Sequence, residues 1–281
     1  MTAFRDRTIL VTGAASGLGR LMTRTMVAEG GRLVLWDVDV QGLQATRGEL
    51  ASSGASVATY ACDLSDRAAI AAVAARTLAE CGPVDILVNN AGVVSGKALL
   101  DESDGDIERT FAVNTLALFW TTRAFLPAML ERDRGHIVTI ASAAGLVGTT
   151  KLVDYCASKH AAVGFDESLR LELRRARSRV VTTVVCPFYI STGMFEGVRT
   201  RVPWLLPILE PDYAVARILD AIRNDRRRLI MPRFVALTYL ARLMPVPLFD
   251  AMMEFLGVTR SMEEFRGRAL PTADRRAAGS R

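Results

Sequence analysis

The chain contains only two histidines and four cysteines, and no two cysteines form a Cys-x-x-Cys pair. Structural zinc sites are built from closely spaced cysteine and histidine ligands, so the sequence gives no reason to expect a metal centre. The scattered cysteines also do not form a disulfide framework. We interpret Cys62, Cys81, Cys156 and Cys186 as small buried side chains in a reducing cytoplasm.

Long apolar runs are also lacking. No uninterrupted stretch reaches the about 18 apolar residues that suggest a membrane-spanning helix, and the polar residues 1–7 do not resemble a signal peptide. The sequence therefore predicts a cytoplasmic protein.

Aromatic residues are scarce, at 7%, and none interleaves with the arginines at 170–179 and 223–228 that contribute to the net charge of +5. Sites for single-stranded nucleic acid combine cations with stacking aromatics, so we interpret these arginines as solvated helix faces. Nucleic-acid binding is a weaker alternative, and salt-dependent retention on DNA would support it.

Short apolar runs alternate with helical patterns along most of the chain. This alternation predicts an α/β fold with right-handed crossovers, a doubly wound parallel sheet in a three-layer α/β/α sandwich. The predicted strands are Thr8–Thr12, Arg32–Trp36, Val57–Ala61, Ile86–Val88, Ile137–Ile140 and Val180–Val185. One predicted helix follows the first strand and ends at Ala28. The other predicted helices span about Val40–Ser52, Asp66–Cys81, Ile107–Arg132 and Val153–Arg175.

The remaining parts of the chain complete one predicted domain. We expect a single Rossmann-type domain over residues 1–265, in which a helical lid spans about 190–212 and a C-terminal helical extension about 230–265. Residues 266–281 are expected to form a flexible tail.

Polar or glycine-containing motifs follow each predicted strand. Ligands of doubly wound sheets bind outside the carboxyl ends of the strands, so these motifs predict a site at that edge. They begin at Gly13, Asp37, Asp63, Asn90, Ser142 and Pro187.

A glycine-rich turn follows the first strand and opens a helix. Its glycines permit a tight turn and close approach of the backbone to a phosphate, and the helix start offers N–H groups to that phosphate. The spacing is Gly-x-x-x-Gly-x-Gly, which differs from the general dinucleotide fingerprint. The candidate phosphate-binding residues are Gly13, Ser16, Gly17, Leu18 and Gly19.

Asp37 ends the second strand and indicates which nucleotide is bound. A carboxylate there can accept hydrogen bonds from the adenosine ribose and would repel a 2′-phosphate. Val38 follows, where an arginine would have favoured NADP, and Ser16 is also uncharged. The sequence therefore favours NAD, with NADP as the alternative.

Tyr155 and Lys159 lie four residues apart, on one face of a predicted helix. A tyrosine hydroxyl has an ordinary pKa of about 10, and a neighbouring ammonium lowers it by favouring the phenolate. Ser142, thirteen residues before the tyrosine, could bind the substrate oxygen whose proton moves. This triplet predicts an acid/base site.

Together these segments resemble the short-chain dehydrogenase/reductase family over roughly residues 5–230. The resemblance implies that Tyr155 is the catalytic acid/base and that Ser142 polarises the substrate oxygen. It implies that Lys159 lowers the tyrosine pKa and binds the nicotinamide ribose, and that Asn114, in the long helix, holds a water of the proton relay. It also implies a homodimer or homotetramer.

The same resemblance supplies the other cofactor residues. Asp63 and Leu64 would flank the adenine, and Thr192 would contact the nicotinamide carboxamide. The remaining members of this set, which would line the cofactor cleft, are Asn90, Ala91, Gly92, Pro187 and Ile190.

Phe188 stands where the family commonly has glycine. The run Cys186–Phe195 looks like the subgroup of retinol, long-chain alcohol and hydroxysteroid dehydrogenases. We therefore expect Phe188, Met194 and Phe195, together with Ser142, to form the substrate pocket. An apolar lid would suit a lipophilic substrate, because burying apolar surface is favourable by about 25 cal/mol per Å².

A second apolar region spans residues 229–258 and is divided by Pro245 and Pro247 into two short helices. It could pack on another subunit, form the substrate entrance, or make a peripheral membrane contact, which the sequence does not favour.

The sequence predicts an NAD-dependent oxidoreductase that interconverts a lipophilic alcohol and its ketone or aldehyde. An NADPH-dependent carbonyl reductase is the closest alternative. A catalytically inactive cofactor-binding scaffold is an alternative of another class, although the four residues Asn114, Ser142, Tyr155 and Lys159 argue against it.

Overall fold

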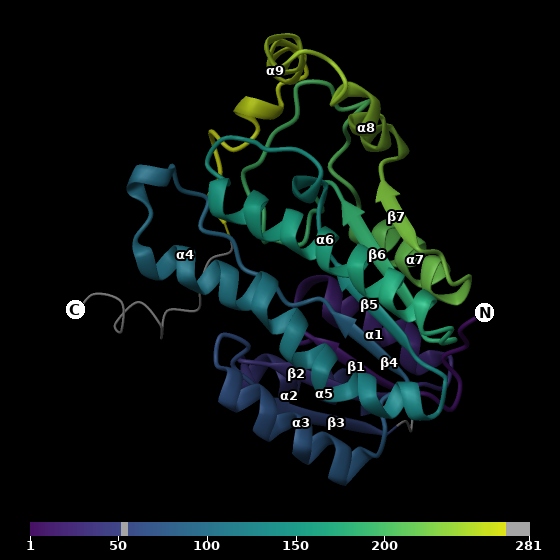
Figure 1. Ribbon diagram of the computed structural model, residues 1–281. Coiled ribbons are helices and arrows are strands. Elements are labelled where there is room, and N and C mark those ends of the chain that lie inside the picture. The colour runs from purple at the N-terminus through teal and green to yellow at the C-terminus, as the bar shows by residue number, and fades with distance from the viewer. Residues whose placement is uncertain (52–55, 268–281) are drawn as a thin grey trace.

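The protein's structure, a computed structural model, describes residues 1–51 and 56–267, and within them seven parallel strands form one sheet (Figure 1). The strands are β1 (Thr8–Thr12), β2 (Arg32–Asp37), β3 (Val57–Ala61), β4 (Ile86–Asn89), β5 (His136–Ile140), β6 (Val181–Pro187) and β7 (Arg228–Met231). Their order is β3-β2-β1-β4-β5-β6-β7. The order reverses between β1 and β4, where a doubly wound sheet opens a crevice for a ligand. The predicted fold class is confirmed.

Helices cover both faces of the sheet. One face carries α1 (Gly17–Ala28), α2 (Val40–Ala51) and α7 (Pro211–Arg223), and the other carries α3 (Arg67–Cys81), α5 (Ala117–Glu131) and α6 (Val153–Arg175) (Figure 1). Alternate strand residues serve the two faces: Ile9 joins the α1 side and Leu10 joins the α5 side. This alternation is the period of two that a strand imposes on its side chains.

Strand β7 was not predicted from the sequence, and part of it falls at the start of the predicted C-terminal extension. The strand has only four residues and follows a run of arginines, so it has no apolar pattern long enough to be recognised. It forms because β6 offers a free edge: Cys186 is paired with Ile230 and Pro187 with Met231.

The predicted long helix 107–132 is interrupted. It begins earlier, as α4 (Asp104–Phe111), and passes through a π-helical turn at Ala112–Leu116 before α5 begins. A π turn inserts one extra residue and is often found at functional sites. Asn114 lies in the middle of it.

The lid is not helical, contrary to prediction. Residues 190–210 consist of turns, irregular backbone and one isolated bridge between Ile190 and Leu209, and a helix starts only at Pro211. Gly193 and Gly197 adopt φ of 87° and 88°, a left-handed backbone that favours glycine, and prolines follow at 203 and 207. These residues interrupt the helical hydrogen-bond pattern, so the lid keeps its position through contacts with other segments.

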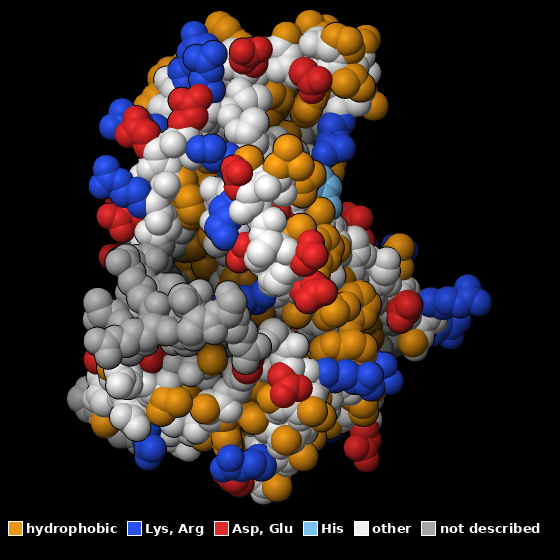
Figure 2. Space-filling view, turned by 90° about the vertical axis from the view of Figure 1, so that its left-hand side faces the viewer, with side chains coloured by type: hydrophobic (Ala, Val, Ile, Leu, Met, Phe, Trp, Pro, Cys, Tyr) orange, Lys and Arg blue, Asp and Glu red, His pale blue; other side chains and the backbone are white. Residues whose placement is uncertain are grey.

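The C-terminal extension projects beyond the sheet at the same end as the lid (Figure 1). It contains α8 (Thr238–Ala241), α9 (Val246–Phe255) and the short 3₁₀ turns Arg233–Leu237 and Val258–Arg260. Two helices form, as predicted, but only Pro245 lies between them, as the N-cap of α9, whereas Pro247 lies in the first turn of α9. Figure 2 shows apolar side chains gathered on this projecting end.

Among the described helices, none is both long and apolar enough to cross a membrane. Most of the expected flexible tail, residues 268–281, lies outside the described residues, as does Ser52 at the predicted end of α2.

Candidate active site

A cavity of about 270 Å³ opens at the carboxyl ends of the central strands. It brings together most of the predicted site residues from seven separate parts of the chain. Gly19 and Asn114 do not line it. Those that do are Gly13, Ser16, Gly17, Leu18, Asp37, Asp63, Leu64, Asn90, Ala91, Gly92, Ser142, Tyr155, Lys159, Pro187, Phe188, Ile190, Thr192, Met194 and Phe195.

The glycine-rich turn forms one end of the cavity. Gly13 and Gly17 have φ of 65° and 55°, and α1 begins at Gly17, so the positive end of its dipole lies in the cavity wall. A side chain at Gly19 would overlap the carbonyl oxygen of Gly13. Asn90 fastens the turn, because its Nδ2 donates to the carbonyl oxygens of Thr12, at 2.9 Å, and Gly13, at 3.2 Å. This tightly built cradle fits a dinucleotide phosphate.

Asp37 is held rigidly beside that turn. Its Oδ2 accepts the N–H of Ala15 at 2.9 Å, and its Oδ1 accepts the N–H of Asp39 at 3.0 Å. A carboxylate oxygen can accept more than one hydrogen bond, so both oxygens retain capacity for ribose hydroxyls. The carboxylate of Asp63 instead accepts two bonds from Ser65, from its N–H at 2.9 Å and its hydroxyl at 2.7 Å.

Asn114 lies behind the cavity wall and organises it. Its Oδ1 accepts the N–H of Val93 at 2.8 Å, and its Nδ2 donates to the carbonyl oxygen of Val93 at 2.9 Å. The same Nδ2 donates to the hydroxyl of Ser158, on α6, at 3.1 Å. Both amide hydrogens are therefore used to join the segment after β4 to the helix that carries Tyr155.

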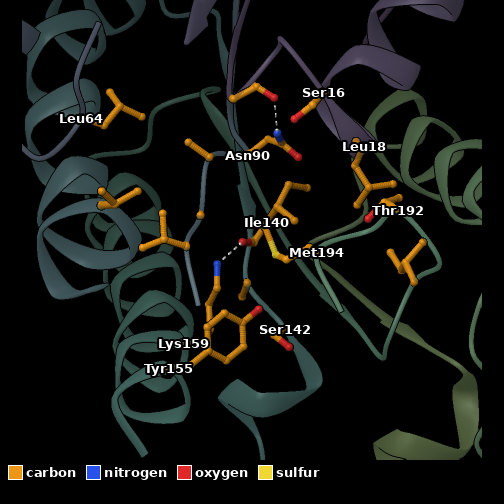
Figure 3. A pocket seen from close by; sticks show the side chains of 18 of the residues that line it. Ser16, Leu18, Leu64, Asn90, Ile140, Ser142, Tyr155, Lys159, Thr192 and Met194 are labelled. Carbon is orange, nitrogen blue, oxygen red and sulfur yellow. Dashed lines mark hydrogen bonds between the residues drawn. The ribbon is translucent and has the colours of Figure 1, made fainter. Parts of the chain in front are cut away.

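Tyr155 and Lys159 lie in the first two turns of α6, and each side chain is buried. The Nζ of Lys159 donates to the carbonyl oxygen of Ile140 at 3.0 Å and lies 5.6 Å from the centre of the Tyr155 ring. Ser142 follows β5, and its Oγ accepts the N–H of Ala144 at 3.1 Å. Figure 3 shows the side chains of Tyr155 and Ser142 next to one another in the cavity.

Burial controls the titration of this pair. It raises the pKa of Tyr155, because the phenolate is removed from water, while a hydrogen bond with Ser142 lowers it to a smaller extent. Burial lowers the pKa of Lys159 to about 8. The raised tyrosine pKa is opposite in direction to the predicted effect of Lys159. Burial is the largest cause of the raised pKa, and the Lys159 ammonium donates its hydrogen bond to Ile140.

Aromatic side chains surround the other end of the cavity. Phe195, from the lid, meets Tyr155 edge-on with ring centres 5.7 Å apart, and Tyr189 lies 5.1 Å from Phe195. Phe188 lies 4.7 Å from Tyr189. The hydroxyl pair therefore faces an apolar surface rather than a polar one.

Several residues that line the cavity were not predicted from the sequence. Most of them lie next to a predicted site residue in the sequence, and that position could have identified them. Arg109, on α4, has no predicted site residue beside it. They are Val38, Cys62, Val93, Arg109, Val113, Ile140 and Ala141. The described residues include no group of three or more side chains suited to hold a metal ion.

Comparison with known proteins places this geometry in context. The family model for short chain dehydrogenases matches residues 7–203. The chain is 48% identical to short-chain dehydrogenase/reductase family 16C member 6 of Bos taurus, covering 92% of this chain and 82% of that protein. It is 45% identical to epidermal retinol dehydrogenase 2 of Mus musculus (94% and 86% covered) and 42% identical to retinol dehydrogenase 10 of Rattus norvegicus (91% and 84%).

Solved structures show the same fold. A short chain dehydrogenase/reductase from Burkholderia phymatum in complex with NAD is 29% identical, with a TM-score of 0.78 over 97% of this chain and 100% of that one. A metagenomic short-chain oxidoreductase in complex with NADP is 33% identical, with a TM-score of 0.67 over 82% and 96%.

Proposed function

The chain belongs to the short chain dehydrogenase family of oxidoreductases, and we propose that it is an NAD-dependent enzyme that interconverts a lipophilic alcohol and its aldehyde or ketone. One observation carries the proposal. Ser142, Tyr155 and Lys159 line the same cavity as the glycine-rich turn, so acid/base groups and a dinucleotide cradle share one site.

NAD, when bound, supplies the hydride acceptor for alcohol oxidation. The turn from Gly13 to Gly19 would hold its phosphates, Asp37 its adenosine ribose, and Lys159 its nicotinamide ribose. Asp37 favours NAD over NADP, because a fixed carboxylate repels a 2′-phosphate. The solved relatives include one complex of each kind, so the preference rests on Asp37.

In the oxidation direction, Tyr155 as its phenolate would accept the hydroxyl proton while the carbinol hydrogen would leave as hydride to the acceptor that NAD supplies. Ser142 donates a hydrogen bond to the substrate oxygen and stabilises its developing negative charge. The ammonium of Lys159, 5.6 Å from the centre of the Tyr155 ring, would favour the phenolate electrostatically and so oppose the effect of burial. In the reduction direction Tyr155 returns the proton. Asn114 acts by holding α6 in register with the cavity wall.

The substrate class follows from the aromatic end of the cavity. Phe188 and Phe195 offer apolar surface next to the reacting hydroxyls, which favours a hydrophobic alcohol. Two of the relatives are named retinol dehydrogenases, which supports a retinoid-like alcohol as the first substrate to test. The family resemblance supports a homodimer or homotetramer.

A panel of alcohols graded by chain length and ring count, retinol included, tests the proposal with NAD and NADP at equal concentrations. Reduced nicotinamide absorbance should rise with apolar alcohols and NAD. A preference for short polar alcohols would contradict the lipophilic substrate, and NADH binding without turnover of any alcohol would indicate the inactive scaffold.

The cofactor preference has its own control. Asp37→Ala should narrow the difference in kcat/KM between NAD and NADP. Asp39→Ala should not, because the Asp39 carboxylate bonds the N–H of Gly42 and does not line the cavity. A wild-type protein that already prefers NADP would overturn the role of Asp37.

A further inference from the structure

The tyrosine of the active site shares a buried apolar cluster with a segment far outside the matched family region. Tyr155 belongs to a buried apolar cluster that includes Met262, which is fully buried, and Phe265 packs on the same cluster. The family model ends at residue 203. We call residues 261–267 the C-terminal strap, because they cross the lid beside the cavity.

Hydrogen bonds join the strap to the lid and to Tyr189, the residue just before the lid. The main-chain N–H of Arg199 donates to the carbonyl oxygen of Ser261 at 3.2 Å, and that of Arg266 donates to the carbonyl oxygen of Glu196 at 2.9 Å. The hydroxyls of Tyr189 and Ser261 are buried and lie 2.9 Å apart. Because the lid is built of turns, these contacts supply the order that a helix would otherwise give it.

Phe265 is the strap residue whose ring packs near the aromatic side chains of the substrate end. Its ring centre lies 6.3 Å from that of Phe195, which in turn meets Tyr155 edge-on at 5.7 Å. On its other side Phe265 lies over Gly96, where φ is 68° and any side chain would overlap the ring. Phe265 does not itself line the cavity, so it acts by supporting Phe195 from behind.

We propose that Phe265 is a specificity-determining residue that fixes Phe195 as the far wall of the substrate end, and so excludes bulky polycyclic alcohols in favour of slender apolar ones. This rests on the proposed function. Without the Phe265 ring, Phe195 can move into the space above Gly96. The cavity beside Tyr155 then becomes wider, and the lid loses one of its apolar contacts.

The test compares 1-decanol with a tetracyclic hydroxysteroid, using NAD and the full chain. In Phe265→Ala, the ratio of kcat/KM for the steroid to that for decanol should rise about tenfold, equivalent to about 1.4 kcal/mol. Tyr213→Ala is the control, because that aromatic side chain lies on α7 with 51% of its surface exposed, and it should leave the ratio unchanged. An equal change for both alcohols would refute the assignment.

A double-mutant cycle tests whether Gly96 and Phe265 act together on the ratio of kcat/KM values. Gly96→Ala alone should raise the ratio, because its methyl group displaces Phe265. In the Phe265→Ala background it should change the ratio little, because residues in contact give non-additive effects. Fully additive effects would show that the two residues do not act together. Should Phe265→Ala not fold, Phe265→Leu keeps apolar volume and should shift the ratio in the same direction.

Hydrogen exchange separates this inference from the proposed function. Main-chain amides in residues 191–199 should exchange about tenfold faster in Phe265→Ala than in the wild type, because the lid opens more often. Unchanged exchange in that variant would overturn the role of Phe265 even if no alcohol is oxidised. If the wild type oxidises no alcohol but the lid of the variant exchanges faster, the proposed activity on alcohols is wrong. The role of Phe265 in supporting the lid would still stand.

Discussion

Replacing Lys159 with methionine should stabilise the protein while removing activity. Burial lowers the pKa of this lysine from its ordinary value of 10.5 to about 8. One pKa unit corresponds to about 1.36 kcal/mol, so holding the ammonium in the fold costs about 3 kcal/mol at neutral pH. Losing the hydrogen bond to Ile140 offsets about 1 kcal/mol of the gain. We expect Lys159→Met to raise the free energy of unfolding by about 2 kcal/mol at pH 7.

The pH dependence of that gain identifies its cause. The folded-state pKa lies below the unfolded one, so the cost is fully present below pH 8 and is relieved as the pH rises from about 8 to 10.5. The charge cost should therefore fall from about 3 kcal/mol at pH 7 to about 1 kcal/mol at pH 10. The stability difference between Lys159→Met and the wild type should shrink by that amount.

Urea unfolding of both proteins at pH 7 and pH 10 measures this difference, and turnover of the best alcohol measures the loss of function. A variant less stable than the wild type at pH 7, or a difference that is the same at both pH values, would refute the reasoning. We expect Lys159→Met to be more stable than the wild type and inactive. The wild-type site would then keep a destabilising charge because the reaction needs it.

Three further perturbations test other parts of the structure. Gly19→Ala should weaken NADH binding at least about tenfold, measured by fluorescence titration, because its methyl group would overlap the glycine-rich turn; Gly48→Ala, with open space around it on α2, should bind normally. Asn114→Ala should lower the urea midpoint by the equivalent of about 2 kcal/mol, because the N–H and carbonyl of Val93 lose their partner, and an unchanged midpoint would argue against that clamp. Burial lowers the pKa of His136 to about 4 from 6.5, so native stability falls by about 3 kcal/mol between pH 6.5 and 4; in His136→Gln this fall should be absent, and an equal fall in both proteins would contradict it.

The sequence predicted the sheet well because parallel strands are buried on both faces and appear as continuous apolar runs. It also located the cavity, since Gly13, Asn90 and Ser142 each end such a run and the carboxyl ends of parallel strands meet at one edge. Strand β7 had no comparable signal, because its four residues depend on pairing with β6.

Long-range packing could not be predicted in the same way. The buried cluster that holds Tyr155 and Met262, and the packing of Phe265 near Phe195, join residues with no shared periodicity. The titration of Tyr155 was predicted in the wrong direction for a related reason: helix spacing places Lys159 nearby, but only the packed structure shows how deeply both groups are buried. Local sequence patterns therefore predict the helices and strands, whereas the pKa values of the site depend on burial in the folded protein.

Turnover by Tyr155→Phe is the most direct test of the acid/base account. The substitution removes one hydroxyl and keeps the ring that packs against Phe195, so the fold and NADH binding should survive. We expect kcat for alcohol oxidation to fall by about a thousandfold, within the range that a positioned acid/base group contributes. Turnover near that of the wild type would contradict the central claim that Tyr155 moves the proton.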